Sequence, residues 1–338
     1  MPSSRPRAHA VMSAEAYELL FDEARRRRFA ELADVRTPMH IADLTAPGLD
    51  ELLAEAEVLI TSWGAPRFEA PLLDRMPRLR AVFHAAGSIR QHVSEDFWER
   101  GIRITTAADA NAVPVAEFTL ATILLAGKRV FPHVRTPALA AADWGGNLRD
   151  FSIGNLDRTV GLVGFSRIGR RVAELLRPFA GLKVLVADPF ADAAEVAATG
   201  AELVALEEML PRVSVLSLHA PALPSTHHMI SVRELAALPD GATVINTARG
   251  ALLDHDALIA ECRTGRLDAV LDVTAPEPLP LDSPLLDLPN VVLTPHLAGS
   301  LGTETRRLTD SALDELEAYA AGSPLLHPMD AVSLARSA

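Results

Sequence analysis

Apolar and polar positions along the first third of the chain follow two alternating periods. Positions spaced as on one face of a helix predict helices at 14–34, 49–56 and 71–76. Short continuous apolar runs predict buried strands at 39–44, 58–62 and 79–84. Residues 1–10 precede these elements, and we expect them to be disordered. Helices alternating with strands predict an α/β domain with a parallel sheet.

A long apolar segment separates this region from a second one. Residues 114–131 predict a helix with a proline near its start, and its apolar surface requires burial on more than one side. A strand–helix rhythm follows, which predicts a doubly wound parallel sheet with helices on both faces. The candidate strands are 159–163, 183–187, 202–204, 213–218, 243–246, 269–273 and 291–293.

The end of the chain is helical again over residues 301–321. We expect this helix to return to the first domain, so that the chain crosses between domains twice and leaves a cleft at the crossing. The expected boundaries are residues 1–110 for the first part of a substrate-binding domain, 111–298 for a cofactor domain, and 299–338 for the return.

The segment TVGLVGFSRIGRRVAELL has the pattern of a buried strand, a tight turn and an amphipathic helix. Gly164, Ser166 and Gly169 occupy the G-x-G-x-x-G positions, with serine in the middle, and Arg167 and Ile168 complete the turn. Serine is small and can donate a hydrogen bond to a phosphate oxygen held at the helix N-terminus. The segment therefore predicts a dinucleotide-binding turn.

Asp188 ends the next predicted strand, nineteen residues after Gly169. A carboxylate at this place accepts hydrogen bonds from the adenosine ribose and repels a 2′-phosphate, which favours NAD over NADP. The alternative is an ordinary Asp-Pro turn at the end of a strand. The order of strand, turn, helix, strand and acid favours the NAD interpretation.

Polar side chains follow three further predicted strands. Arg249 follows one, Asp272 and Glu277 another, and His296 the last. Ligands of open α/β sheets bind beyond the carboxyl ends of the strands, so we expect these residues to converge there. Taken singly, Arg249 reads as a turn cap, Glu277 as a surface residue and His296 as a loop histidine.

Several of these segments also occur together in a known family. The chain resembles the D-isomer-specific 2-hydroxyacid dehydrogenases from about residue 79 to residue 300, in NAVPVAEF, the glycine turn, LHAPALPSTHHMI, NTARGALLD, LDVTAPEP and TPHLAGS. The resemblance implies two Rossmann-like domains, with the NAD domain inserted into a flavodoxin-like substrate domain. It also implies a homodimer joined through the region of residues 114–131.

By this resemblance Arg249, Glu277 and His296 are catalytic residues that interconvert a 2-oxo acid and its D-2-hydroxy acid. Histidine titrates near neutral pH and can exchange a proton with the substrate oxygen. A carboxylate beside it favours the imidazolium and orients the ring. A permanently charged arginine binds the substrate carboxylate and polarises the reacting carbonyl.

The resemblance also assigns residues to the cofactor. Asp272 corresponds to the residue that holds the nicotinamide carboxamide, and His219, beyond another strand end, is a candidate wall of the cofactor pocket. The other candidates for NAD binding are Gly164, Ser166, Arg167, Ile168, Gly169, Asp188, Ala220, Pro221, Thr226, Thr247, Ala248 and Gly299.

The loop HAAGSIRQHV follows the predicted strand 79–84. By the resemblance Ala86, Gly87 and Ser88 supply backbone amides to the substrate carboxylate, and a glycine keeps side-chain atoms away from that anion. Most relatives continue with a second glycine and an acid, where this chain has Ile89 and Arg90. Arg90 then either contacts a second acidic group of the substrate or faces the solvent.

Composition narrows the classes of partner. A net charge of −12 argues against nucleic acid, and we expect the basic run at 25–28 to be the solvated face of a helix. Cys262 is the only cysteine, which excludes an internal disulfide and a cysteine-based metal site and fits the cytoplasm. No apolar run approaches the ~20 residues of a bilayer span, and the N-terminus has no secretory pattern.

Other functions stay open beside the dehydrogenase. A phosphite dehydrogenase uses a similar set of Arg, Glu and His, whereas formate-type relatives carry Gln at the place of Glu277. A phosphoglycerate dehydrogenase is possible, although the sequence stops before the regulatory domain that often follows in that enzyme. A non-catalytic NAD-sensing scaffold of the corepressor type could keep all three residues.

Overall fold

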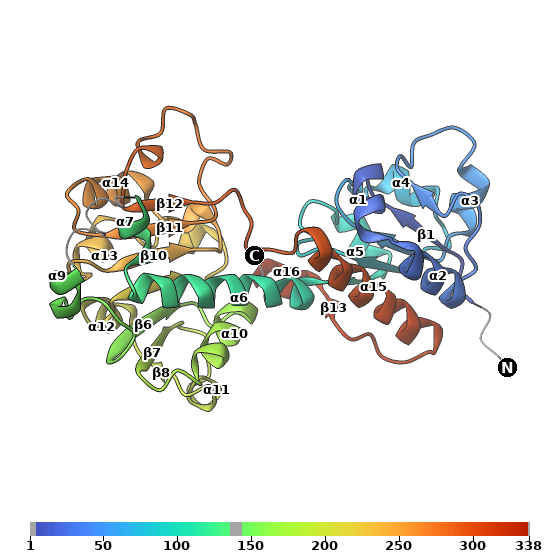
Figure 1. Ribbon diagram of the computed structural model, residues 1–338. Helices are drawn as coiled ribbons and strands as arrows, with labels where there is room; N and C mark the ends of the chain where they lie inside the picture. Colours follow the sequence, from blue (N-terminus) through green and yellow to red (C-terminus); the bar gives the residue numbers. More distant parts are fainter. Residues whose placement is uncertain (1–4, 136–143, 337–338) are drawn as a thin grey trace. The chain divides into compact units, whose positions relative to one another are not determined.

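The computed structural model describes residues 5–135 and 144–336, and the chain divides into two compact units (Figure 1). Unit 1 runs to Asn111 and resumes at Ser300, and unit 2 is the continuous segment Ala112–Gly299. The first crossing lies inside α6 (Ala108–Gly127). Each unit is built on its own sheet.

The sheet of unit 1 has the strand order β13-β5-β4-β3-β1-β2. All neighbouring strands are parallel, as expected, except β13 and β5, which pair antiparallel at one edge of the sheet. The order 2-1-3-4-5 of the parallel strands is flavodoxin-like. The strands are β1 (Ala8–Val11), β2 (His40–Ile41), β3 (Val58–Thr61), β4 (Ala81–His84), β5 (Arg103–Thr106) and β13 (Pro328–Met329).

Helices cover both faces of this sheet. Successive residues of β3 belong to different core clusters, since Ile60 packs with one set of helices and Leu59 with the other. This alternation follows from the period of two in a strand. The helices of unit 1 are α1 (Ala14–Leu20), α2 (Glu23–Leu32), α3 (Asp50–Glu55), α4 (Ala70–Asp74), α5 (Glu95–Glu99), α15 (Thr305–Ala320) and α16 (Ala331–Arg336).

Three expectations for unit 1 are wrong in detail. Ala8–Val11 is a buried strand paired on both sides, so the expected disorder is wrong for residues 8–10, and residues 1–4 lie outside the described part of the chain. The expected helix 14–34 is two helices, because Asp22 caps a new helix by accepting a hydrogen bond from the amide of Arg25. The expected strand 39–44 contains only the two residues of β2, and α5 and β5 were not expected at all.

The basic run of α2 does not simply face solvent. Arg25 pairs with Asp310, and Arg28 pairs with Asp314 and Glu317 of α15. The arginines therefore join α2, near the start of the sequence, to the returning helix α15 near its end. Their cationic charge is neutralised within unit 1.

Unit 2 contains all seven strands that the sequence predicts, in the order β12-β11-β10-β9-β6-β7-β8. All pairs are parallel, and the order around β6 is that of a doubly wound dinucleotide fold, so the predicted fold class is confirmed. The strands are β6 (Arg158–Val163), β7 (Leu182–Ala187), β8 (Glu202–Leu203), β9 (Val215–Leu218), β10 (Thr243–Asn246), β11 (Asp268–Leu271) and β12 (Val291–Leu293).

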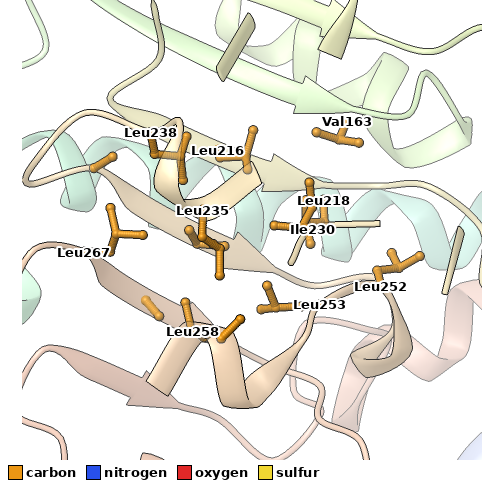
Figure 2. Packing of buried hydrophobic residues seen from close by; sticks show 14 of the residues in the cluster. Val163, Leu216, Leu218, Ile230, Leu235, Leu238, Leu252, Leu253, Leu258 and Leu267 are labelled. Carbon is orange, nitrogen blue, oxygen red and sulfur yellow. The ribbon is translucent and has the colours of Figure 1, made fainter. Parts of the chain in front are cut away.

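The two faces of this sheet carry separate apolar clusters. Figure 2 shows one of them, in which Leu216 and Leu218 of β9 pack with Leu235 and Leu258 from the covering helices. The other contains Val172 of the helix after the glycine turn. The described helices after α6 are α7 (Val130–Arg135), α9 (Trp144–Arg149), α10 (Arg167–Leu176), α11 (Ala193–Ala198), α12 (Leu206–Met209), α13 (Val232–Ala236) and α14 (His255–Arg263).

The long helix α6 begins earlier than the apolar pattern suggested. It starts at Ala108, so Pro114 lies inside the helix rather than in its first turn. α6 is 20 residues long and apolar enough to span a membrane by length and composition alone, which corrects the expectation that no segment approaches that length. Half of its most apolar stretch is buried inside the protein, and core helices of soluble proteins share this property.

Candidate active site

The glycine turn joins β6 to α10 and is packed tightly against the chain after β9. Gly164 has a φ of +100°, and a Cβ there would lie 2.6 Å from the backbone nitrogen of Ala220. A Cβ on Gly169 would lie 2.1 Å from the carbonyl oxygen of Gly164. Both positions therefore require glycine, one for its conformation and the other for close packing of helix against strand.

The middle residue of the turn has a structural role. Ser166 is the N-cap of α10, and its Oγ accepts a hydrogen bond from the amide of Gly169 at 3.4 Å. Its hydroxyl proton can still be donated to a phosphate oxygen. Arg167 is exposed beside it, and Ile168 packs on the apolar face beneath.

Asp188 follows β7 and supports the glycine turn directly. Its Oδ2 accepts from the amide of Phe165 at 2.8 Å, and its Oδ1 accepts from the amide of Phe190 at 2.9 Å. The Asp-Pro turn is thus present. Each carboxylate oxygen keeps a second lone pair, so these bonds leave acceptors for the ribose hydroxyls.

His219 lies beneath the glycine turn at the end of β9. Its Nε2 is 3.0 Å from the Oγ of Ser217, whereas its buried Nδ1 has no hydrogen-bond partner within the described part of the chain. Burial lowers the pKa of His219 to about 3, so the ring is neutral. A buried polar atom without a partner costs free energy, and its position beside the turn fits a polar cofactor.

The other predicted cofactor residues lie after strands of the same parallel sheet and therefore at one edge of it. Thr226 binds locally, through its hydroxyl, to the carbonyl of Pro221. The hydroxyl of Thr247 is 3.0 Å from that of Thr119 in α6. The remaining members of this set are Ala220, Ala248, Asp272 and Gly299.

His296 and Glu277 form an ion-pair geometry at this edge. The Nδ1 of His296 lies 2.8 Å from Oε1 of Glu277, and the two side chains are 53% and 42% exposed. Because an ionised carboxylate only accepts, Nδ1 donates and Nε2 is left for a substrate atom. His296 has a φ of +54°, in the left-handed region that non-glycine residues seldom adopt.

Arg249 lies in the loop after β10, and its Nη1 donates to the carbonyl of Ala248 at 2.7 Å. The residue is exposed to solvent at its surface, although enough protein atoms surround it for desolvation to lower the pKa of its guanidinium. The carboxylate of Glu277 acts in the opposite direction and raises that pKa. Arginine stays protonated under any physiological condition, so the site contains a fixed positive charge near the His–Glu pair.

Two residues that the sequence analysis did not single out shape the Arg249 loop. Asn246, fully buried at the end of β10, donates to the carbonyl of Arg249 at 2.9 Å and accepts from the amide of Ala248 at 3.0 Å. A Cβ on Gly250 would lie 2.1 Å from the carbonyl carbon of Thr274, in the loop that carries Glu277. Gly250 thus lets the two loops touch. A buried asparagine at a strand end, in INTARG, was the available signal.

Asp272 holds the loop that carries His296. It is 1% exposed, and its carboxylate accepts from the hydroxyl of Thr294 at 2.6 Å and from the amides of Leu297 and Ala298 at 2.7 and 2.9 Å. The amide of His296 donates to the backbone carbonyl of Asp272 at 2.9 Å. The structure thus shows a positioning role for Asp272 beside the expected role at the nicotinamide carboxamide.

The predicted carboxylate-binding residues belong to unit 1. Ala86, Gly87 and Ser88 follow β4, and within residues 5–135 and 144–336 none of their backbone amides donates a hydrogen bond. The carbonyls nearby are occupied, since Ala85 accepts from the hydroxyl of Ser62 at 2.9 Å and Ala86 accepts from an amide at 3.0 Å. Consecutive amides without partners are suited to an anion.

Arg90, in the same loop, is exposed. Its Nη2 donates to the carbonyl oxygen of Leu334 in α16 at 2.8 Å.

Among the residues that the structure describes, no cluster of three or more His, Cys, Asp or Glu side chains could hold a metal ion.

Comparison with known proteins places the chain in a family. Residues 122–298 match the sequence model of the D-isomer specific 2-hydroxyacid dehydrogenase, NAD binding domain. The glyoxylate/hydroxypyruvate reductase B of Yersinia enterocolitica is 33% identical over 281 residues, which are 82% of this chain and 85% of that protein. The D-3-phosphoglycerate dehydrogenase of Methanocaldococcus jannaschii is 32% identical over 259 residues, 76% of this chain and 48% of that protein.

This chain therefore spans about half the length of the phosphoglycerate dehydrogenase that it matches. Among solved structures, the TT0316 protein of Thermus thermophilus superposes with a TM-score of 0.70 at 32% identity, covering 96% of this chain and all of the other. Together with the glycine turn and the parallel sheet, these matches show that the chain belongs to the D-isomer specific 2-hydroxyacid dehydrogenases and carries their NAD-binding domain.

Proposed function

We propose that this protein uses NAD(H) to interconvert a 2-oxo acid and its D-2-hydroxy acid. The observation that carries the proposal is the 2.8 Å contact between Nδ1 of His296 and Oε1 of Glu277. The guanidinium of Arg249 interacts electrostatically with the same carboxylate. These are the groups that reduction of a carbonyl needs besides a hydride donor: a proton source, an orienting carboxylate and a fixed cation.

His296 is the proposed acid and base. In reduction, the imidazolium gives the Nε2 proton to the substrate oxygen as the hydride reaches C2, and in oxidation the neutral ring removes it. Glu277 keeps the Nδ1 proton in place, so only one tautomer forms, and it stabilises the imidazolium. The exposed ring can return to its starting protonation state by exchange with water.

Arg249 is proposed to bind the substrate carboxylate and to polarise the carbonyl that is reduced. Its planar guanidinium can donate to two oxygens at once. Asn246 and Gly250 hold its loop against the Glu277 loop, so the charge is fixed before substrate arrives.

The residues at the carboxyl edge of the second sheet fit NAD. The glycine turn and the N-terminus of α10 suit the pyrophosphate, the Nδ1 of His219 offers an unpaired polar atom, and Asp188 suits a ribose without a 2′-phosphate. The bound cofactor supplies the hydride that His296 complements with a proton. We propose NAD rather than NADP on the ground of Asp188.

The proposed carboxylate contact in unit 1 is the backbone of Ala86, Gly87 and Ser88. Within the described residues these three consecutive amides have no hydrogen-bond partner, and such donors can bind a carboxylate without a side-chain charge. The substrate class is therefore a small 2-oxo acid. Glyoxylate and hydroxypyruvate are natural first choices, because a relative at 33% identity is named for their reduction.

A substrate panel tests the proposal. NADH absorbance is followed with glyoxylate, hydroxypyruvate, oxaloacetate and phenylpyruvate, and NAD reduction is followed with D-3-phosphoglycerate and phosphite. We expect turnover with at least one 2-oxo acid and a clear preference for NADH over NADPH. Turnover of phosphite alone would identify a different reaction at the same residues. NADH binding without turnover of any compound would identify a sensor and refute the proposal.

We also propose that the protein forms a homodimer through the segment beside the end of α6. Three large apolar side chains are exposed there, Leu148 at 67%, Phe151 at 98% and Leu156 at 77%. They line a hollow of about 830 Å³ together with residues at the start of β6, away from the His–Glu pair. A second copy would cover this apolar surface.

Sedimentation velocity tests the dimer. The wild type should sediment as a dimer, and Phe151→Asp should shift the population toward monomer without loss of secondary structure. Phe190→Asp, which changes an equally exposed aromatic residue in another part of unit 2, is the matched control. A monomeric wild type contradicts the proposal.

A further inference from the structure

The loop at residues 85–93 joins β4 to α5 and is fixed mainly by its second half. Ile89 is 1% exposed and Val93 is 4% exposed, and both pack in the cluster on one face of the unit 1 sheet. At the start of the loop His84 is fully buried, with its Nδ1 2.9 Å from the hydroxyl of Thr61. The amides of residues 86–88 lie between these two anchors.

The C-terminal segment of the chain is bound firmly to unit 1. Glu315 of α15 is 1% exposed, and its carboxylate accepts from the amides of Leu326 and His327 at 2.8 and 2.7 Å. The next residues form β13, which pairs with β5. The bonds to Glu315 and the pairing of β13 with β5 thus fix the chain just before α16 begins.

Helix α16 then contacts the 85–93 loop. Asp330 precedes it and accepts from the amide of Ser333 at 2.6 Å, as an N-cap does. Leu334 packs on the same apolar cluster as Ile89, and its carbonyl oxygen accepts from the Nη2 of Arg90 at 2.8 Å. A cation at the last carbonyls of a helix is favourable, because those carbonyls have no partner within the helix.

We propose that Arg90 is a positioning residue that ties the 85–93 loop to α16 and thereby sets the spacing of the three substrate-binding amides. Arg90 acts through the loop and not by contact with a second acidic group of the substrate. The inference rests on the proposed function, because it concerns how the carboxylate of the 2-oxo acid is bound. It assigns a role in substrate affinity to the C-terminal helix.

Two variants separate this role from direct contact. Arg90→Ala removes the bond from the loop side, and Asp330→Ala weakens α16 from its other end. Each should raise KM for monoanionic glyoxylate and dianionic oxaloacetate by the same factor, about 2- to 10-fold, the worth of one hydrogen bond. The kcat and the KM for NADH should stay near wild type. The double variant should have a KM for each 2-oxo acid no higher than that of the more affected single variant, because both changes break the same connection.

Arg100→Ala is the matched control, since Arg100 is an arginine of unit 1 that pairs with the surface carboxylate of Asp74. It should leave every KM unchanged. A rise in KM confined to oxaloacetate in Arg90→Ala would show direct substrate contact and overturn the inference. Unchanged KM values for both substrates, or fully additive effects in the double variant, would overturn it as well.

Hydrogen exchange distinguishes failure of this inference from failure of the proposed function. Without substrate, the amides of His92 and Val93, which donate to the carbonyl of Ile89 at 2.9 and 3.2 Å, should exchange faster in Arg90→Ala and in Asp330→Ala than in wild type or Arg100→Ala. If exchange rises as expected but no 2-oxo acid is reduced, the proposed function fails while the link to α16 stands. If a 2-oxo acid is reduced and exchange is unchanged, the link itself is absent.

Discussion

Two loops of this protein leave buried strands in similar ways and present opposite chemistry. The loop after β12 turns its amides inward, where Asp272 accepts from Leu297 and Ala298, and it presents the side chain of His296. The loop after β4 turns carbonyls inward, toward donors such as Ser62, and it leaves the amides of residues 86–88 unpaired. The buried partner of each loop thus decides which groups the loop exposes. The buried carboxylate of Asp272 binds the amides of its loop, so that loop exposes the side chain of His296. Buried donors such as Ser62 bind the carbonyls of the other loop, so that loop exposes amides that can bind an anion.

The largest expected effect follows removal of the side chain that the first loop presents. His296→Ala should lower kcat by at least about 10²-fold, since general acid–base help is worth about 10² to 10⁴ in rate. The dissociation constant for NADH, measured by fluorescence titration, should stay nearly unchanged. His227→Ala alters an exposed histidine in unit 2 and should leave kcat intact. A His296→Ala variant that keeps most of its turnover would remove His296 from the mechanism.

The next effect follows weakening of the acid beneath the first loop. Asp272→Asn removes a charged acceptor from two amides and a hydroxyl, which should cost about 2–3 kcal/mol in the free energy of unfolding. We expect kcat to fall about 10-fold because the His296 loop loosens. Denaturant unfolding and steady-state kinetics measure the two quantities, with Asp287→Asn as an exposed control. A variant with wild-type stability would show that the carboxylate is not the anchor.

The free energy of unfolding should depend on pH through His84, at the start of the loop after β4. Burial lowers the pKa of His84 to about 3, with a further contribution from His92, so the folded protein keeps this ring neutral where the unfolded chain takes up a proton. Stability is then complete above about pH 6.5 and falls as pH drops toward 3. At pH 5 the loss from His84 is about 2 kcal/mol. His219, whose pKa burial also lowers to about 3, adds a similar loss in unit 2.

Denaturant unfolding at pH 7.5 and pH 5 measures this loss. His84→Gln should lower stability at pH 7.5 and should also reduce the difference between the two pH values. His227→Gln should leave the difference as in wild type. If His84→Gln and wild type lose the same stability on acidification, the buried imidazole of His84 does not carry the effect.

The smallest effect concerns Ser62, whose hydroxyl donates to the loop after β4. Ser62→Ala leaves the carbonyl of Ala85 without its hydroxyl donor and should cost about 1 kcal/mol in the free energy of unfolding. KM for the 2-oxo acid should rise slightly while kcat is maintained. Ser323→Ala, an exposed serine of unit 1, is the control. An unchanged KM together with the expected loss of stability would limit Ser62 to a structural role.

Sequence patterns predicted unit 2 better than unit 1, for physical reasons. Strands of a doubly covered parallel sheet are continuous apolar runs, and such runs are easy to recognise. In unit 1, β5 contains Thr105 and Thr106, and β13 is only two residues long, so neither has a clear pattern. The apolar period also continues through Phe21, which hides the break that Asp22 makes between two helices.

The candidate site was predicted residue by residue only where a family motif covered it. Arg249, Glu277 and His296 came from such motifs, and the structure places all three after strands of one sheet. Asn246 and Gly250 act through backbone contacts between loops that are distant in sequence, and no local pattern reports such contacts. The same holds for Arg90, whose partner Leu334 lies 244 residues away. The cytoplasmic location and the dimer stay predictions.

The discontinuity of unit 1 orders events during synthesis. Residues up to Asn111 leave the ribosome first, but their core includes Leu308 and Leu313 of α15, which emerge only after the whole of unit 2. Unit 2 is continuous and has its own apolar clusters, so it can fold before α15 is synthesised and while the core of unit 1 is still incomplete. Translation that pauses before α15 would therefore expose the face of the unit 1 sheet that this helix covers.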